Sequence, residues 1–170
     1  MPLRDIVTLP DPILRRKART ITRFDADLQS LIDDMIETMR EAPGVGLAAP
    51  QVGISRRLIV VEYPEDDELD EAPKKLYVVV NPEIKETSDE TEMGIEGCLS
   101  IPGLHGEVER SIALTVKGQT RRGQPMKIKA KGWLARIFQH EIDHVNGVVF
   151  TDRAAKVWKP APEEPVLDNV

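Results

Sequence analysis

The chain has 170 residues, of which 41% are hydrophobic and 31% charged, and its net charge is −6. This length and composition favour one soluble globular domain with a sizeable core over two small domains. The apolar stretches, such as residues 77–80, are far shorter than the roughly 20 residues of a membrane span, and the acidic balance disfavours tight, nonspecific nucleic-acid binding, which depends on basic surface.

The N-terminal residues 1–12 contain no basic region followed by an apolar stretch and a small-residue cleavage site, so they do not indicate a secretory signal. The chain has a single cysteine, Cys98, which excludes an internal disulfide and agrees with a reducing compartment. We therefore expect a cytoplasmic protein.

The first predicted helix lies between residues 24 and 44. Its apolar residues recur at helical spacing, which predicts one buried face, and Pro43 and Gly44 end the pattern. These apolar residues are Leu28, Leu31, Ile32, Met35, Ile36 and Met39.

Residues 44–53 follow with the sequence GVGLAAPQVG. Gly44 and Gly46 permit close backbone approaches, and Gln51 contributes an uncharged amide donor. On its own this segment indicates a turn built of small residues. It lacks the Lys-Ser/Thr ending of a phosphate-binding loop.

Short β-branched runs bounded by Gly, Pro or charged residues predict four strands. They cover residues 57–63, 75–84, 111–118 and 124–132. The acidic, Pro-containing stretch 64–74 is expected to be an exposed loop between two of them.

Residues 96–103, with the sequence EGCLSIPG, contain the only cysteine. Three roles are open for Cys98: a small buried hydrophobe, a nucleophile or a metal ligand. The segment does not decide between them by itself.

The last predicted helix, residues 133–147, carries the motif HExxH, with Gly147 as a plausible C-cap. His140 and His144 are one helical turn apart on the same face and can reach one metal ion, while Glu141 can handle a proton from water at that ion. The alternative is a solvated helix with incidental histidines. His105, the third histidine, lies in a Gly-flanked stretch and is expected to be an exposed turn residue.

A catalytic metal usually has three protein ligands and an open position, so two histidines leave one ligand missing. Cys98 could complete such a site as a thiolate, because a cation favours loss of the thiol proton. A buried apolar Cys98, or a nucleophilic Cys98 with a histidine base, stays open at this point.

Taken together, the segments resemble the peptide deformylases, in order and approximate spacing. The three motifs are GVGLAAPQ, EGCLS and QHEIDH, and the resemblance extends to LPDPILR, VNPEI, IPGLHGEVER and GVVFTDR, up to about residue 153. The family removes the formyl group from the N-terminal formylmethionine of newly made polypeptides and releases formate. The resemblance therefore implies a metal-dependent amide hydrolase.

The resemblance implies a role for each motif. Cys98, His140 and His144 would bind the metal, and Glu141 would be the general acid and base. The Gln51 side chain and the backbone N–H of Leu99 would hold the oxyanion. The usual ion would be ferrous iron (Fe2+), with Ni2+, Zn2+ or Co2+ as substitutes in preparations.

In this family the peptide lies as an added strand, so the expected backbone contacts are Val45, Gly46 and Gly97. The methionine pocket would be apolar, with Val45, Trp133 and Ile137 as walls. Gly94 and Ile95 stand where many relatives carry larger or acidic residues, which leaves one edge of this pocket undefined.

The implied fold is α+β, with antiparallel or mixed β-sheets packed around a central metal-binding HExxH helix and with an N-terminal helix. Residues 1–158 would form the catalytic domain and residues 159–170 an extended or mobile tail. The expected partners are N-formylmethionyl nascent peptides, with transient proximity to the ribosome. The tail lacks the basic helix by which some members approach the ribosome, so no such contact is predicted, and an organellar origin stays open beside a bacterial one.

Two rival interpretations remain. One is a zinc peptidase of the HExxH class that cuts an internal peptide bond and uses a third ligand other than Cys98. The other is a binding module that holds a structural metal or formylated peptides without turnover. A structural zinc site usually has four protein ligands, and only three candidates have suitable spacing here.

Overall fold

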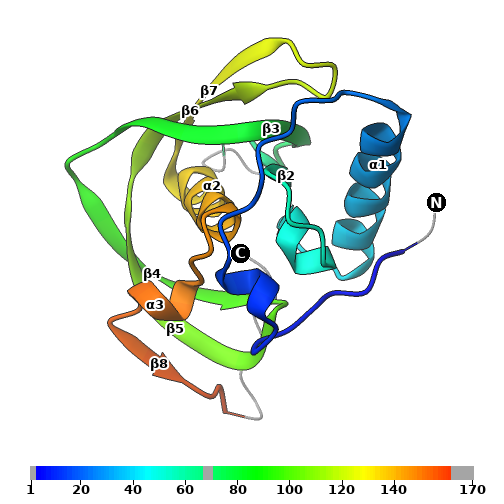
Figure 1. The fold of residues 1–170 in the computed structure, drawn as a ribbon. Helices are drawn as coiled ribbons and strands as arrows, with labels where there is room; N and C mark the ends of the chain where they lie inside the picture. The colour runs from blue at the N-terminus through cyan, green and yellow to red at the C-terminus, as the bar shows by residue number, and fades with distance from the viewer. Residues whose placement is uncertain (1–2, 67–70, 162–170) are drawn as a thin grey trace.

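The computed structural model describes residues 3–66 and 71–161, which form two antiparallel sheets around a central helix (Figure 1). The first sheet has the order β1-β2-β3-β6-β7 and the second the order β4-β5-β8. The strands are β1 (Gly46–Ala48), β2 (Leu58–Pro64), β3 (Lys74–Thr87), β4 (Thr91–Cys98), β5 (Ile101–Ser111), β6 (Ala113–Gln119), β7 (Pro125–Lys131) and β8 (Lys156–Trp158).

Three α-helices and two 3-10 turns complete the described part of the chain. They are η1 (Pro12–Arg15), α1 (Ala26–Glu41), η2 (Ala49–Val52), α2 (Gly132–Val145) and α3 (Phe150–Arg153). The expected α+β architecture with antiparallel sheets is confirmed, as are the two long helices and the four predicted strands.

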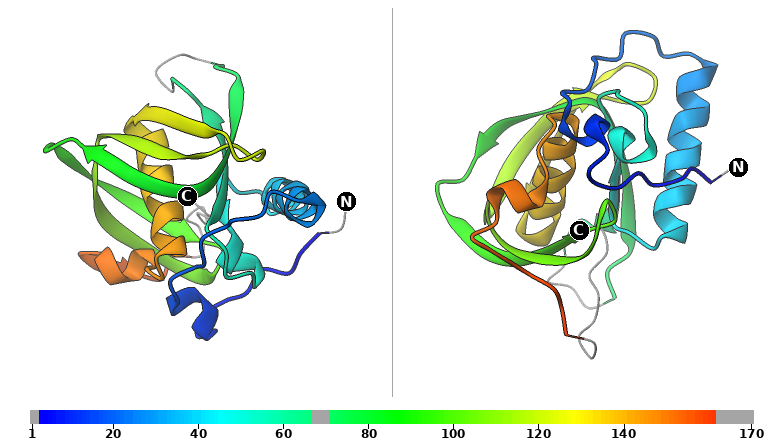
Figure 2. Two further views of the ribbon diagram at one scale, coloured as in Figure 1. Left: turned by 45° about the horizontal axis from the view of Figure 1, so that its top comes forward. Right: turned by 60° about the horizontal axis from the view of Figure 1, so that its bottom comes forward.

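The HExxH helix α2 is enclosed by strands of both sheets (Figure 2). Every residue from Leu134 to Val145 is buried. A helix buried on all sides must also bury its polar residues, so each of these needs a hydrogen-bonding or charged partner. α2 ends at Val145, and its C-cap is Asn146 and not Gly147 as predicted; Gly147 follows in the left-handed conformation, at φ 78°.

Strand β2 separates two parts of the core. Ile59 and Val61 pack in the cluster around α2, whereas Leu58 and Val60 pack in the cluster around α1. Because side chains alternate across a strand and both faces of β2 are covered at residues 58–61, these four residues form a continuous apolar run.

Asp25 caps α1 by accepting from the backbone N–H of Leu28 at 3.0 Å.

Strands β1, β4, β5 and β8 were not predicted from the sequence, and the expectation for His105 was wrong. His105 lies within β5, is only 4% exposed and pairs in register with Trp158 of β8. The two rings meet edge to face at 6.2 Å. A strand from the far end of the chain therefore covers this histidine.

The N-terminal segment, residues 3–25, crosses the molecule beside η2 and the C-terminal end of α2 (Figure 2). Its backbone N–H groups donate to three carbonyls, Val7 to Gln51, Leu9 to Ser100 and Ala18 to Val145. Each acceptor lies in or beside one of the three sequence motifs.

The predicted acidic loop 64–74 begins and ends within β2 and β3, and its residues 67–70 lie outside the described part. The predicted tail lies outside it from residue 162 onward, so the division at residue 158 stays a prediction. Among the described residues, no helix has both the length and the apolar character to cross a membrane.

Candidate metal centre

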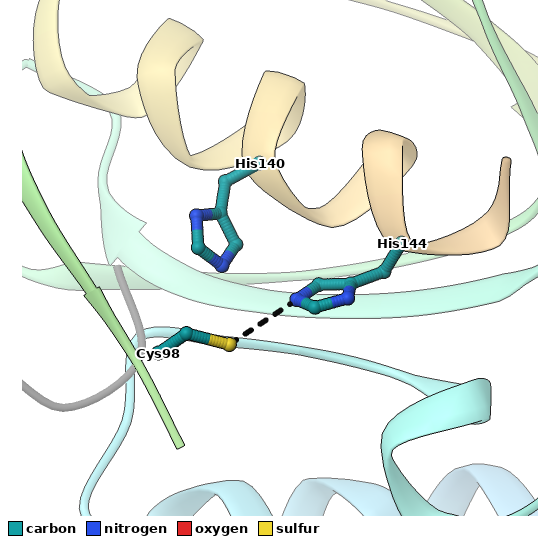
Figure 3. Close-up of side chains that lie close together, drawn as sticks. All are labelled: Cys98, His140 and His144. Atoms are coloured by element: carbon teal, nitrogen blue, oxygen red, sulfur yellow. Dashed lines mark hydrogen bonds between the residues drawn. The ribbon is translucent and has the colours of Figure 1, made fainter. Parts of the chain in front are cut away.

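Cys98, His140 and His144 converge between the end of β4 and the last turns of α2 (Figure 3). One ligand atom from each lies within 4.8 Å of the other two, and all three residues are buried. The Cys98 Sγ and His144 Nε2 atoms are 3.4 Å apart. Two ligands of one tetrahedral ion, at typical Zn–S and Zn–N lengths, would be about 3.6 Å apart, so the spacing fits a shared ion.

The orientation of His140 also fits a metal ligand. Its Nδ1 atom lies 2.9 Å from Glu96 Oε1, and since an ionised carboxylate only accepts, Nδ1 carries the proton. Its Nε2 atom is buried and has no hydrogen-bond partner among the residues described. In the neutral ring this nitrogen has a free lone pair, and it lies near a thiol and a second imidazole. Such a nitrogen is a ligand atom suited to zinc, iron or nickel.

Burial and neighbouring groups shift the pKa values of Cys98 and His144 in opposite directions. Burial, together with the nearby charge of Glu141, raises the pKa of Cys98 well above its usual range. Two backbone N–H groups, of Ser100 and Ile101, partly offset this by hydrogen bonding to the sulfur. Burial and the neighbouring His140 lower the pKa of His144, which keeps its imidazole neutral. A bound cation would supply the charge that the thiolate needs.

Glu96, which the sequence did not single out, contacts the candidate ligand His140. It is fully buried, and Arg110 donates to both carboxylate oxygens at 2.9 Å while Arg136 donates to one at 2.7 Å. Burial alone would raise the pKa of Glu96, but the hydrogen bonds from Arg110 and His140 and the charge of Arg110 lower it well below its usual range. The carboxylate is thus held ionised against the ring of a proposed metal ligand.

Glu141, next to His140 in α2, is fully buried and packs against Gly46 of β1. A Cβ added to Gly46 would lie 2.6 Å from Glu141 Oε2, closer than real contacts allow. The small-residue segment and the HExxH helix therefore meet at this carboxylate.

Gln51 and Leu99 both lie next to Cys98. The Gln51 side chain accepts from the Ala48 N–H at 3.0 Å and donates to Ser100 Oγ at 3.2 Å, and its Nε2 atom is 3.6 Å from Cys98 Sγ. Leu99 occupies the turn between β4 and β5, directly after Cys98. The structure therefore brings both residues to the metal ligands.

The predicted substrate contacts lie on two strand edges. In the described residues β1 is the edge of its sheet and β4 the edge of the other, with Val45 and Gly46 at the first and Gly97 at the second. Trp133 is partly buried in the first turn of α2 and packs, like Val45, against the core cluster around that helix.

Known proteins resemble the chain over nearly its whole length. A family model described as polypeptide deformylase matches residues 3–159. The chain belongs to the polypeptide deformylase family. A peptide deformylase from Natranaerobius thermophilus is 48% identical over 159 residues, which make up 94% of this chain and 97% of that protein.

Solved structures agree in fold as well as in sequence. A peptide deformylase from Thermotoga maritima has a TM-score of 0.82 and 44% identity, covering 92% of this chain and 100% of that chain. Another, from Synechococcus elongatus in complex with actinonin, has a TM-score of 0.81 and 43% identity, covering 92% of this chain and 81% of that one.

The family assignment gives the reaction. This chain is a metal-dependent hydrolase that removes the N-formyl group from newly synthesised, formylated polypeptides. The rival interpretations, an HExxH peptidase and a non-catalytic binding module, are therefore set aside.

Proposed function

We propose that Cys98, His140 and His144 hold a ferrous ion and that deformylation takes place beside it. The observation that supports this most directly is the convergence of one sulfur and two imidazoles within 4.8 Å, in a chain of this family. When bound, the ion would supply Lewis-acid chemistry, polarising the formyl carbonyl and lowering the pKa of water. A thiolate with two imidazoles also suits nickel, zinc and cobalt.

The proton transfers are assigned to Glu141. In this proposal its carboxylate takes a proton from the attacking water and then gives it to the departing amine nitrogen. Its burial against Gly46 supports the role, because a carboxylate held in one position can serve both transfers without reorganising.

Two neutral hydrogen-bond donors are proposed to stabilise the negative charge that develops on the formyl oxygen. They are the Gln51 side-chain amide and the backbone N–H of Leu99, both adjacent to Cys98. Donors already fixed in a buried site stabilise the transition state without reorganisation. The hydrogen bonds of Gln51 to Ala48 and Ser100 supply that fixation.

The peptide is proposed to lie as an added strand along the edges formed by β1 and β4. The backbone of Val45, Gly46 and Gly97 would pair with it, which would explain tolerance of many sequences after the first residue. The methionine side chain would contact Val45, Trp133 and Ile137, all three of which belong to or pack against one apolar cluster.

The setting of the reaction is also a proposal. Residues 1–158 would act as the catalytic domain in a bacterial cytoplasm, close to ribosomes that make the substrate. We expect no membrane partner and no direct binding to nucleic acid.

Formate release from formyl-Met-Ala-Ser, with and without a chelator, tests the function. We expect formate and an intact Met-Ala-Ser product with the metal-loaded protein and none after chelation. Cleavage between Met and Ala would instead indicate a peptidase, and formate release unaffected by complete metal removal would contradict the metal site. Actinonin, present in the structure of the Synechococcus elongatus relative, is a second probe and should raise the melting temperature of the loaded protein.

A further inference from the structure

Arg136 has a buried guanidinium that none of the proposed roles uses. Its side chain is 5% exposed although it lies in α2, one turn before His140. Its Nη1 atom donates to Glu96 Oε2 at 2.7 Å and to the Val108 carbonyl at 2.9 Å, and Nη2 donates to the Glu92 carbonyl at 2.7 Å. Three bonds from a planar group fix its orientation.

The contact of Arg136 with Glu96 leads directly to the metal ligand. Glu96 uses its other oxygen, Oε1, to hold His140 Nδ1 at 2.9 Å. A tilt of the carboxylate would therefore turn the imidazole ring and move its Nε2 atom. Groups that orient a ligating histidine through its second nitrogen influence metal affinity and activity.

The second arginine on Glu96 does not make Arg136 redundant. Arg110 also pairs with Asp143 at 2.7 Å, and Arg153 pairs with the same Asp143. Arg110 is thus shared between two carboxylates. Arg136 pairs with no carboxylate but Glu96 within the described ranges, and its other partners are neutral carbonyls.

Gly94 makes room for this arginine. A Cβ built on Gly94 would lie 2.6 Å from Arg136 Cζ and 2.8 Å from its Nε and Nη2 atoms. These atoms belong to the planar end of a side chain that three hydrogen bonds hold in place, so it cannot yield without losing them. The guanidinium also lies over the ring of Trp133, with 5.2 Å between Arg136 Cζ and the ring centroid.

We propose that Arg136 is a positioning residue for the metal centre, that it acts through Glu96 on His140, and that Gly94 is its matched partner. A side chain at position 94 would push the guanidinium off Glu96 and so loosen the histidine two contacts away. The inference rests on the metal site proposed above.

A double-mutant cycle on the nickel-loaded protein tests the pair. The variants are Arg136→Met, Arg136→Lys, Gly94→Ala and Gly94→Ala with Arg136→Met, and the readouts are nickel affinity by chelator competition and kcat and KM separately. We expect Arg136→Met to lower nickel affinity by about 10–100-fold, as for other groups that orient a ligand. Arg136→Lys should lose less, because it keeps a charge near Glu96 but not the three fixed bonds.

Coupling is the decisive outcome. Gly94→Ala should weaken nickel binding in the native background and cost little more once Arg136 is already Met. Arg121→Met is the matched control: Arg121 also binds a carboxylate, Asp33, and an amide, Gln29, but against α1. It should lower the melting temperature and leave nickel affinity unchanged.

Different failures are distinguishable. If the native protein binds no nickel, the metal site itself is wrong. If it binds nickel and Arg136→Met binds it equally well, or if the losses at positions 94 and 136 simply add, the positioning role is wrong. Should Arg136→Met not fold, Arg136→Lys and Gly94→Ala decide alone: unchanged nickel affinity in both would overturn the proposal.

Discussion

The carboxylate of Glu141 occupies the space that a side chain at Gly46 would need, with 2.6 Å from Oε2 to the position of an added Cβ. This contact joins the HExxH helix to the edge strand β1. Gly46 has no positive φ, so it is required here for space and not for backbone conformation.

Gly46→Ala should therefore disable the proton-transfer residue without touching a metal ligand. Since positioned acid–base catalysis contributes about 10²–10⁴-fold, we expect turnover to fall by at least 10-fold while metal content stays at one per chain. Steady-state kinetics and metal analysis of the same sample measure both. Turnover equal to that of the native protein would show that Glu141 need not hold this position.

Glu141→Gln should keep the metal and lose catalysis, because the amide preserves the volume but cannot carry the proton. The expected loss is on the order of 10²–10⁴-fold in kcat. Metal analysis of the purified variant is the control. A variant that loses its metal would identify Glu141 as a ligand.

Gln51→Leu and Gln51→Glu separate oxyanion stabilisation from a structural role. Both remove the amide donor and should lower turnover by about 10²–10³-fold with little change in KM. Leucine also leaves the buried Ala48 N–H without its acceptor, at a cost of about 1–3 kcal/mol, whereas glutamate retains an acceptor oxygen. Normal turnover with a lowered melting temperature in Gln51→Leu would mean that the residue only holds the segment.

Air should inactivate the iron form through its single thiol. Oxygen oxidises ferrous iron and then the thiolate, whereas nickel(II) resists that step. We expect a nickel-loaded sample to stay active, an aged iron sample to carry added oxygen on Cys98 by mass spectrometry, and Cys98→Ser to bind metal weakly. Full metal occupancy and full activity in Cys98→Ser would make Cys98 a packing residue.

The ion pair of Glu62 and Arg40 should make a small part of the stability pH-dependent. Arg40 donates to both oxygens of Glu62, at 3.0 and 2.7 Å, and these hydrogen bonds, against the opposing effect of burial, lower the pKa of Glu62. The folded pKa is thus below the unfolded one of about 4.3, so the contribution is present above that pH and is lost as the pH falls through the folded pKa.

Arg40 is half exposed, so the contribution should be at most about 1 kcal/mol. Denaturant midpoints of the native protein and Glu62→Gln should differ at pH 7 and converge near the acid end of the transition. A constant difference at every pH would show that packing and not charge is lost.

Much of the fold was predictable because local patterns of apolar and β-branched residues indicate helices and strands. The apolar spacing predicted α1 and α2, and the β-branched runs predicted four strands of the larger sheet. The hairpin of β4 and β5 was not predicted because Gly94 and Gly97 interrupt β4 and because inward positions hold Glu96 and Arg110 instead of apolar residues. Charges at core positions break the alternation that identifies a strand.

Some residues of the candidate site were also predictable from the sequence, and others were not. Spacing and resemblance led to Cys98, His140 and His144, which the structure brings together. Glu96 and Arg136 could not be paired from sequence, because their contact exists only after β4 has joined its sheet and α2 has packed against it. Burial of His105 likewise depends on β8, from the other end of the chain.

The path of the N-terminal segment has a consequence for how the protein folds. The backbone N–H groups of Val7, Leu9 and Ala18 donate to carbonyls in or beside the three motifs, and the bond from Ala18 to Val145 closes a loop over residues 18–145. Contacts between residues so distant in sequence form late and slowly, because closing the loop costs entropy before the contacts repay it. We therefore expect tight metal binding only in the last step of refolding. The rate at which activity recovers should then equal the rate of the slowest folding phase.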